Sequence, residues 1–389
     1  MTPTFDLRAH TQLLTVAGSR AYGTHTGHSD VDLKGIAVPP TRWFYSYHLN
    51  FAQADRPQDI AVFEPLLNVE ERAATERTKL EGVVYGMRKF CRLAADANPN
   101  ILDVLFCRED EVRLCTDTGR ALRNARHLFV TAKARFTFAG YASSQLKRIR
   151  THRRWILHPP AHKPQREQFD LPPNPVVPHN QRDAAEAAIR KRIDGWNVDY
   201  GSLEPAERIR IEAHISHWLA EVQLGLSRDE AQWSAAASHV GLDDNLIEIL
   251  RDERRYNSAM GEWQRFCNWK RSRNPERAAL EAQHHYDTKH GAHLVRLMRM
   301  AHEILTTGEV HVWRGAGGPD DAQELLDIRA GRWSYEHLME WCTRQDLQLE
   351  QTYLTREYSI PVAPDRPAID ALCTELVERA LRDTRTSRA

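Results

Sequence analysis

Short hydrophobic runs alternate with polar and turn residues over roughly the first 110 positions of the chain. The runs have the length of strands, and two of them stop at residues that end strands, Gly18 and Pro39. The predicted strands are residues 13–17, 30–38, 59–63 and 81–85. The last one leads into a helical pattern over 86–97, which Asn98 and Pro99 end. This mixture predicts an α/β or α+β domain.

From about residue 118 the apolar spacing is mostly helical. A proline-rich connection over 159–178 interrupts it and is expected to be an exposed loop or partly disordered. Helices are predicted near 182–194, 205–225, 228–238, 244–270, 275–307, 319–331, 334–348 and 365–382. We therefore predict an α+β protein, with a small mixed sheet flanked by helices in residues 1–115 and a mainly helical region in residues 116–389.

Two acidic residues lie one position apart on the second predicted strand, in residues 29–35 (SDVDLKG). Strand alternation places Asp30 and Asp32 on one face, so their carboxylates repel each other unless a cation lies between them. Such oxygen ligands suit Mg²⁺, which commonly shares its coordination shell with substrate phosphates. Upstream, Gly18 and Ser19 offer bare backbone and a hydroxyl for a phosphate tail. The pattern predicts a nucleotidyl-transfer site.

Composition adds little to this prediction and excludes some alternatives. The formal net charge is zero, so the molecule as a whole has no basic field for nucleic acid. The six cysteines are widely spaced and form no C-x-x-C pair, which fits a reducing cytoplasm and gives no zinc or redox motif. We see neither a signal peptide nor an apolar stretch of about 18 residues, so we expect a cytoplasmic protein without a membrane span.

Phosphodiester chemistry with two metals needs two cations about 3.5–4 Å apart. One metal lowers the pKa of an attacking hydroxyl, and the other stabilises the triphosphate and the departing pyrophosphate. Three carboxylates usually hold both ions, so Asp30 and Asp32 need a third acid from a neighbouring strand or turn. Most isolated D-x-D pairs are solvated loop acids, but the preceding Gly-Ser and the alternating apolar residues favour a functional site here.

The motifs at 18–24 (GSRAYGT) and 29–35 resemble those of the polymerase-beta-type nucleotidyltransferase superfamily. They resemble most the RNA-repair-pathway, RNA-ligase-associated branch. Further similar segments are 85–90 (YGMRKF), 98–106 (NPNILDVLF), 140–146 (GYASSQL) and 286–290 (YDTKH). The similar segments lie between residue 18 and about residue 310, with little that resembles the family between 165 and 275.

The resemblance implies a metal-dependent enzyme that uses an NTP and Mg²⁺ or Mn²⁺. Gly18 and Ser19 would contact the triphosphate, and Asp30 and Asp32 would bind both metals. The third acid of the family pattern falls on Glu81, where relatives carry aspartate. Glutamate is one methylene longer, so the metal for the attacking hydroxyl could be placed differently or held weakly.

Glu64 is a rival third ligand, because a strand over 59–63 would bring it near the other acids. We favour Glu81 as the third ligand. The alternative interpretation of Glu81 is a solvated acid at the start of a helix.

A tract from Asp117 to Glu167 contains many cations and no acidic residue between its ends. Unbroken positive charge with interleaved aromatics is typical of nucleic-acid binding, and Trp155 is the aromatic most suited to stacking on a base. The alternative is a helix surface that acids from elsewhere neutralise. The cations are Arg120, Arg123, Arg126, Lys133, Arg135, Lys147, Arg148, Arg150, Arg153, Arg154, Lys163 and Arg166.

A predicted helix over 287–306, with Asp287 as a plausible N-cap, carries an apolar stripe on one side and Lys289, His293 and Arg296 on the other. Stacked cations repel modestly, and an anion such as a triphosphate would remove that cost. The alternative is a solvated face. Histidines also cluster around 284–293, but none has a zinc-site spacing, and we assign no structural metal. The Gly-rich 315–318 lacks the Lys-Ser/Thr of a phosphate loop and predicts a plain turn.

These observations predict transfer of an NMP from an NTP to an acceptor hydroxyl, with Asp30, Asp32 and Glu81 holding Mg²⁺. The resemblance implies that the acceptor is an RNA 3′ end, such as that of a damaged tRNA, and that an RNA-repair ligase is a possible partner. Two alternatives remain open. The acceptor could be a protein or small-molecule hydroxyl, or the chain could be a degenerate RNA-binding module without activity.

Overall fold

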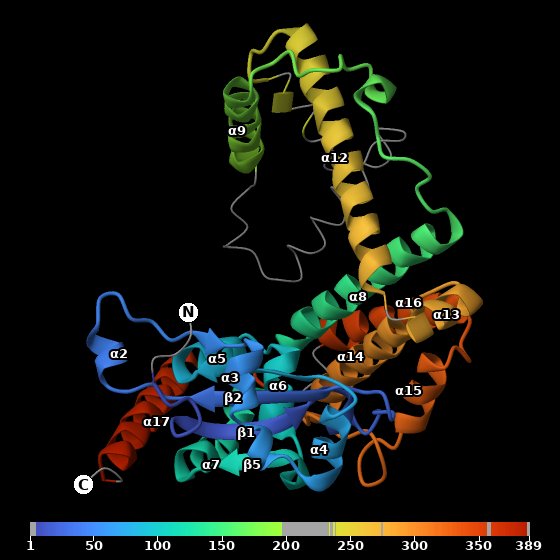
Figure 1. Ribbon diagram of the computed structural model, residues 1–389. Helices are drawn as coiled ribbons and strands as arrows, with labels where there is room; N and C mark the ends of the chain where they lie inside the picture. The colour runs from blue at the N-terminus through green and yellow to red at the C-terminus, as the bar shows by residue number, and fades with distance from the viewer. Residues whose placement is uncertain are drawn as a thin grey trace. The chain divides into compact units, whose positions relative to one another are not determined.

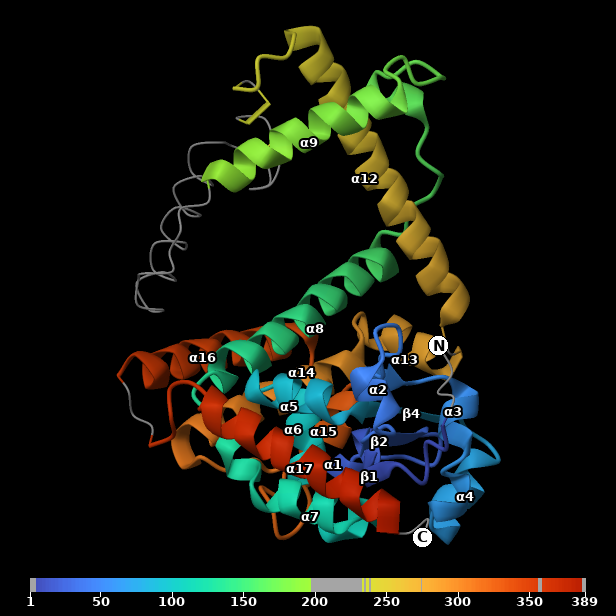
Figure 2. The same ribbon diagram turned by 90° about the vertical axis from the view of Figure 1, so that its left-hand side faces the viewer.

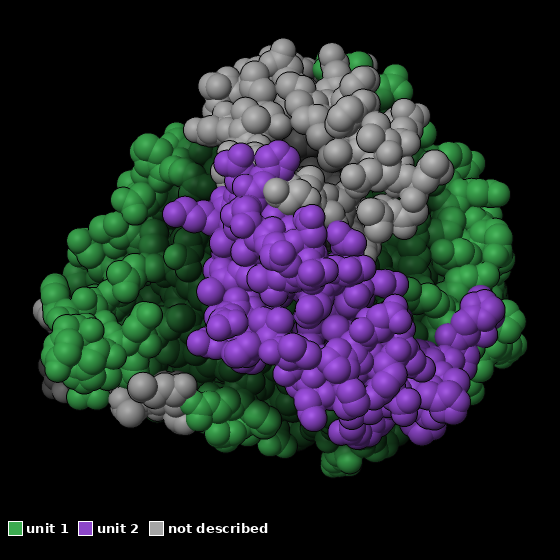
Figure 3. Space-filling model, turned by 90° about the horizontal axis from the view of Figure 1, so that it is seen from above, with its two compact units in different colours: residues 1–156, 279–389 green, residues 157–278 purple. Residues whose placement is uncertain are grey.

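The computed structural model describes residues 5–196, 233, 236–237, 239–273, 275–355 and 359–386. The chain divides into two compact units (Figure 3). Unit 1 comprises residues 1–156 and 279–389, and unit 2 comprises residues 157–278. Unit 1 is therefore built from two separate stretches of chain. The sheet domain predicted for residues 1–115 falls entirely within it, and that boundary stays a prediction.

Unit 1 contains a mixed five-stranded sheet with the order β3-β4-β2-β1-β5. β2 pairs antiparallel with β1 and parallel with β4. Figures 1 and 2 show these strands surrounded by helices. The elements of this part are β1 (Thr11–Ala17), α1 (Gly18–Tyr22), β2 (Val31–Ala37), α2 (Arg42–Tyr45), β3 (Gln53–Ala54), α3 (Pro57–Ala61), the 3₁₀ helix η1 (Glu64–Leu66), α4 (Val69–Thr75), β4 (Leu80–Gly86), α5 (Met87–Ala95), α6 (Pro99–Phe106), η2 (Glu109–Glu111) and β5 (Val112–Cys115).

The α+β prediction is confirmed, because helices make up most of the described chain after β5. Those assigned wholly or mainly to unit 1 are α7 (Asp117–Asn124), η3 (Arg126–Phe129), α8 (Ala134–Leu157), α14 (Thr288–Thr307), α15 (Ala322–Arg329), α16 (Tyr335–Leu354) and α17 (Arg366–Thr386). Unit 2 contains η4 (Arg166–Phe169), α9 (His179–Trp196) and α12 (Asp244–Ser272), and α13 (Pro275–His284) spans the boundary. None of the helices in the described ranges combines the length and apolar character that a membrane span requires.

Strand alternation gives the sheet two buried faces. Leu13 and Ile36 belong to a large core that includes residues of α5, α6 and α14. Leu14 and Leu33 belong to a second core, formed with Ile60, Phe63 and other residues of the segment from α3 to α4. Because Asp32 lies two positions before Lys34 and four before Ile36, all three point to the face with the large core.

Two predictions about elements are wrong. Residues 59–63 are not a strand: they begin within α3, where Pro57 occupies the first turn and Ile60 and Phe63 face the second core at helical spacing. The pattern over 275–307 is not one helix, because His285 has a φ of +59° and the chain starts again at α14.

Other predictions agree with the structure. Asp287 caps α14, and its side chain accepts a hydrogen bond from the His290 amide. Residues 315–318 form a turn closed by the Gly318 amide on the Gly315 carbonyl. The predicted helix at 205–225 lies outside the described residues, and that at 228–238 lies mostly outside them.

Candidate active site

The predicted acidic residues lie at the edge where β2 begins. Asp30 immediately precedes the strand, and Asp32 is paired with Ala17 on β1 and with Glu81 on β4. Paired residues in a ladder point to the same face, so Asp32 and Glu81 share one. Asp30 accepts a hydrogen bond from the Lys79 amide through Oδ1 at 3.2 Å. The ladder thus places Asp32 and Glu81 side by side on β2 and β4, with Asp30 immediately before β2.

Gly18 lies directly against the Asp32 carboxylate. It has a φ of +64°, and a Cβ built on it would overlap Asp32 Oδ2. Any other residue would therefore meet both backbone strain and a steric clash. The sequence Gly18–Ser19 opens α1, the five-residue helix that follows β1. The bare backbone predicted to hold a phosphate thus adjoins a predicted metal ligand.

The charges around Asp32 act against one another. Burial is the largest influence and raises the pKa of the Asp32 carboxyl. The Lys34 ammonium opposes this, the Asp30 and Glu81 carboxylates raise the pKa further, and Lys289 lowers it. A half-buried carboxyl with acidic neighbours gains from a bound cation, which would favour its charged form. These oxygens are the donor set that Mg²⁺ or Mn²⁺ prefers.

The three acids are not drawn tightly together. In the described part of the chain, another group of side chains, His152, Glu281 and Asp287, has its ligand atoms all within 4.8 Å of one another. The assignment of Glu81 as third ligand stays a prediction that the ladder pairing favours. Glu64, the rival, is exposed in η1, and the strand expected to bring it near the site is a helix.

Of the predicted row on α14, Lys289 is exposed, His293 is half-buried and Arg296 is buried. Arg296 is 3% exposed, and its guanidinium carbon lies 3.7 Å from the centre of the Tyr22 ring. Its Nη2 donates to His293 Nδ1 at 3.2 Å. Burial, with the charges of Arg296 and other nearby cations, lowers the pKa of His293 to about 3, so this imidazole is neutral near pH 7. Lys289 is exposed, and its charge acts on Asp32.

The sequence patterns did not identify some residues of the site. Lys34 donates from Nζ to the Asn100 carbonyl at 3.0 Å, and burial lowers the pKa of this lysine. The Tyr22 hydroxyl donates to Asp103 Oδ2 at 2.5 Å. The alternation that puts Asp30 and Asp32 on one face also puts Lys34 there, and could have identified it. Nothing in the sequence pairs Tyr22 with Asp103, because Asp103 lies in α6, 81 residues further along the chain.

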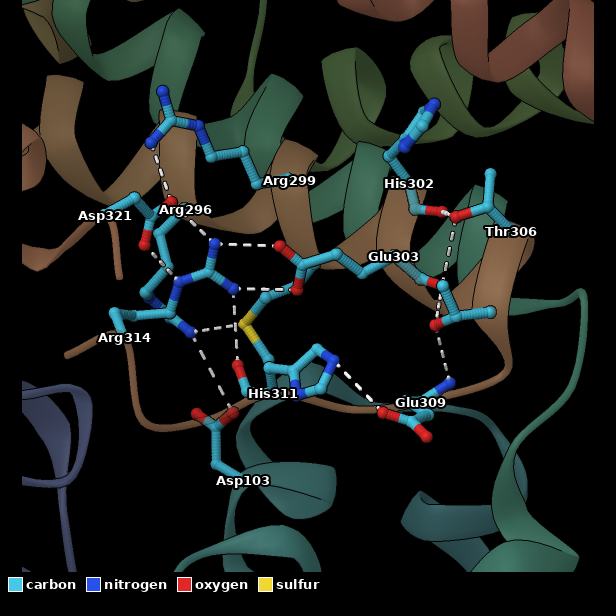
Figure 4. A network of polar contacts seen from close by, with 12 residues as sticks. Asp103, Arg296, Arg299, His302, Glu303, Thr306, Glu309, His311, Arg314 and Asp321 are labelled. Atoms are coloured by element: carbon cyan, nitrogen blue, oxygen red, sulfur yellow. Dashed lines mark hydrogen bonds and ion pairs between the residues drawn. The ribbon is translucent and has the colours of Figure 1, made fainter. Parts of the chain in front are cut away.

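A buried ion-pair network lies around Arg314, and Figure 4 shows its side chains. Arg314 is 0% exposed and bonds through its guanidinium to Glu303 of α14 and to Asp321, which precedes α15. Its backbone amide donates to the Tyr22 carbonyl at 3.1 Å. The chain between α14 and α15 thereby fixes the end of α1, whose first residue adjoins Asp32.

The basic tract is partly neutralised by acids from elsewhere. Arg123, Lys133, Arg135, Arg153 and Arg166 each form an ion pair with an aspartate or glutamate. This is the alternative that the sequence left open. The stacking role considered for Trp155 is wrong, since this side chain is 4% exposed and packs its ring on His152.

Residues 8–159, which contain the Gly-Ser and acidic motifs, match the sequence pattern of a known family. This segment matches the model of the RNA repair pathway DNA polymerase beta family, RlaP. The RlaP segment includes the whole sheet and all three predicted metal ligands, whereas Lys289, His293 and Arg296 lie beyond it. The resemblance inferred from the motifs is thus confirmed.

One curated relative extends the comparison. The chain is 30% identical over 135 residues to an uncharacterised 38.9 kDa protein of the nrdC-mobD intergenic region in Enterobacteria phage T4. The alignment spans 33% of this chain and 35% of the phage protein, about a third of each. No solved structure matches the chain.

Proposed function

We propose that the protein is a metal-dependent nucleotidyltransferase that moves an NMP from an NTP to the 3′ hydroxyl of an RNA end. The observation that carries this proposal is the contact between Gly18 and the Asp32 carboxylate, beside the charges of Asp30 and Glu81. It joins the bare backbone proposed to bind phosphate to the carboxylate oxygens proposed to bind metal. The match of residues 8–159 to the RlaP family model supports the same reaction class.

Asp30, Asp32 and Glu81 fit hard divalent cations, because all their donors are carboxylate oxygens. Bound Mg²⁺ or Mn²⁺ would lower the pKa of the attacking hydroxyl and neutralise the triphosphate. The protein would do the rest by positioning: β2 and β4 hold the acids in register, and Gly18 leaves room for Asp32.

Phosphate charge would be met by Lys34 and Lys289, whose ammonium groups both act on Asp32. Ser19 would add its hydroxyl. His293 would supply a neutral imidazole rather than a charge, and Arg296 would act from its buried place on Tyr22 by holding α14 against α1.

RNA is the acceptor we propose, on the strength of the family and of one surface. Lys147, Arg148 and Arg150 of α8 are exposed cations within the RlaP segment. Contacts with RNA phosphates would make the affinity for RNA fall as the salt concentration rises. Neutralising all three side chains should remove up to about two to three phosphate contacts and weaken this salt dependence accordingly. We further propose a ligase acting on the same RNA ends as a partner.

The test is incubation with Mg²⁺ or Mn²⁺, each labelled NTP and bulk RNA. We expect label in RNA and its loss in the double variant Asp30→Ala/Asp32→Ala, while Asp110→Ala, an exposed acid outside the site, keeps activity. Undiminished labelling by the double variant would refute the site. Label in protein or in a small molecule would identify the other acceptor class, and no label with intact RNA binding would favour a degenerate module.

A further inference from the structure

A second group of metal-ligating side chains lies in unit 1, on elements other than β2 and β4. His152 comes from α8, Glu281 from α13 and Asp287 from the residue that precedes α14. One ligand atom of each lies within 4.8 Å of the others. His152 is far in sequence from Glu281 and Asp287, so no spacing motif reveals the group.

The two carboxylates of this group are almost completely buried. Asp287 is 0% exposed and Glu281 is 2% exposed. Acids so close together and removed from water are costly unless positive charge accompanies them. An ion bound between them would add positive charge at the point where their ligand atoms converge.

The surroundings of Asp287 are those of an oriented ligand. Its Oδ2 lies 3.2 Å from His152 Nδ1, close to the roughly 3.3 Å between two ligands of a tetrahedral ion with bonds of about 2.0–2.1 Å. His290 Nδ1 lies 2.7 Å from the same oxygen, and the His290 amide donates to Oδ1 at 3.1 Å. Hydrogen bonds of this kind fix ligating carboxylates in metal sites.

The ring of His152 is also held in place. Trp155, one turn along α8, stacks on it with ring centres 5.6 Å apart and planes 24° apart. A histidine that is fixed by packing loses little freedom on binding an ion. The three ligands and His290 thus form a site with prearranged donors.

We propose that His152, Glu281 and Asp287 bind a divalent first-row transition-metal ion of the Zn²⁺ class, with His290 orienting Asp287. One imidazole and two carboxylates leave a coordination position open and favour such an ion over Mg²⁺, which prefers oxygen donors. The ion would join α8, α13 and the start of α14, and so fix the turn that presents Lys289. The proposal does not depend on nucleotidyl transfer.

The experiment measures Zn²⁺ binding by the full chain carrying Asp30→Ala/Asp32→Ala, so that the other proposed metal site does not contribute. After equilibrium dialysis against Zn²⁺ alone, elemental analysis should give about one ion per chain. Adding His152→Gln/Glu281→Gln should weaken binding at least about 100-fold. The matched control His158→Gln/Glu340→Gln changes exposed residues of the same types and should bind as the parent does.

Two outcomes would overturn the proposal: no Zn²⁺ bound by the parent, or unchanged binding in the His152→Gln/Glu281→Gln chain. Circular dichroism checks that this chain folds. If it does not fold, the visible absorption spectrum of Co²⁺ bound to the parent chain provides the test instead. Strong visible absorption of a four- or five-coordinate ion is expected, whereas the weak spectrum of six-coordinate, water-like Co²⁺ refutes the site.

Discussion

At the scale of single residues, Gly18 is the position where conformation and chemistry depend on each other. Its positive φ and its contact with Asp32 Oδ2 both require the absence of a side chain. The sequence indicated that a bare backbone was useful for phosphate. The structure adds that the same glycine makes room for the carboxylate expected to bind metal.

We predict that Gly18→Ala abolishes nucleotide transfer and destabilises the fold by about 1–2 kcal/mol, because the new Cβ displaces Asp32 and the backbone conformation is strained. Transfer assays and urea unfolding check this. Gly27→Ala is the matched control, since nothing lies within 4 Å of the Cβ it would add. Full activity in Gly18→Ala would show that the Asp32 position does not matter.

His293 makes stability depend on pH. Its folded pKa is about 3, whereas the unfolded chain has the ordinary value of about 6.5. Between these values the unfolded state binds a proton that the folded state does not, so the free energy of unfolding should decrease as pH falls from about 6.5 towards 3. Stability is therefore greatest, as far as this group is concerned, above pH 6.5.

We predict that His293→Gln flattens this dependence, by up to about 1.4 kcal/mol per pH unit if the other groups are unchanged. Denaturant unfolding at a series of pH values measures it. His158→Gln, at an exposed position, should leave the slope as it is. Identical slopes for His293→Gln and the unmodified protein would mean that His293 titrates normally in the folded state.

At the scale of elements, the segment between α14 and α15, residues 308–321, holds the end of α1 in place, and we call it the brace. The Arg314 side chain bonds to Glu303 of α14 and to Asp321, which precedes α15. The Arg314 backbone amide donates to the carbonyl of Tyr22, the last residue of α1. Gly23, which follows α1, has a φ of +72° and would place a Cβ 2.8 Å from the Trp313 ring. The turn after α1 is thus fitted to this segment.

We predict that Arg314→Met destabilises the protein by about 3–5 kcal/mol, because it leaves Glu303 and Asp321 as partly buried charges without their partner. Thermal and denaturant unfolding measure the loss. Arg332→Met removes an ion pair with Asp327 whose arginine is 70% exposed, and should cost less than about 1 kcal/mol. Equal effects of the two changes would contradict the brace.

At the scale of the whole molecule, the core of the sheet is completed by α14, from much later in the chain. Leu13 and Ile36 share one cluster with Leu294 and Val295 of α14, more than 250 residues later in the sequence. Residues 157–278, by contrast, form unit 2 with an apolar cluster of its own that includes Ile189, Ile247 and Leu250.

We predict that residues 1–115 alone do not fold, because the face of the sheet towards α14 would be exposed. A chain in which about eight Gly/Ser residues replace 157–278 should fold, since such a linker spans roughly 15 Å and ligand atoms of His152 and Glu281 lie within 4.8 Å. Circular dichroism and cooperative unfolding test both. A cooperatively folded 1–115 fragment would disprove the first expectation.

The sequence by itself determined the features that depend on local order along the chain. Strand alternation predicted Asp30 and Asp32 on one face, and turn residues marked the ends of β1 and β2. The α14 cap at Asp287 and the helical spacing after β5 were equally visible, because caps and amphipathic stripes are properties of neighbouring residues.

Only the tertiary structure decided which distant residues meet. Parallel pairing of β2 with β4 brought Glu81 beside Asp32, packing of α14 buried Arg296 on Tyr22, and folding gathered His152 with Glu281 and Asp287. The physical reason is that such contacts depend on how elements pack and on which charges end up excluded from water. The 59–63 segment shows the same limit. A short apolar run fits a strand or a helix equally well, and packing against the core decides which of the two forms.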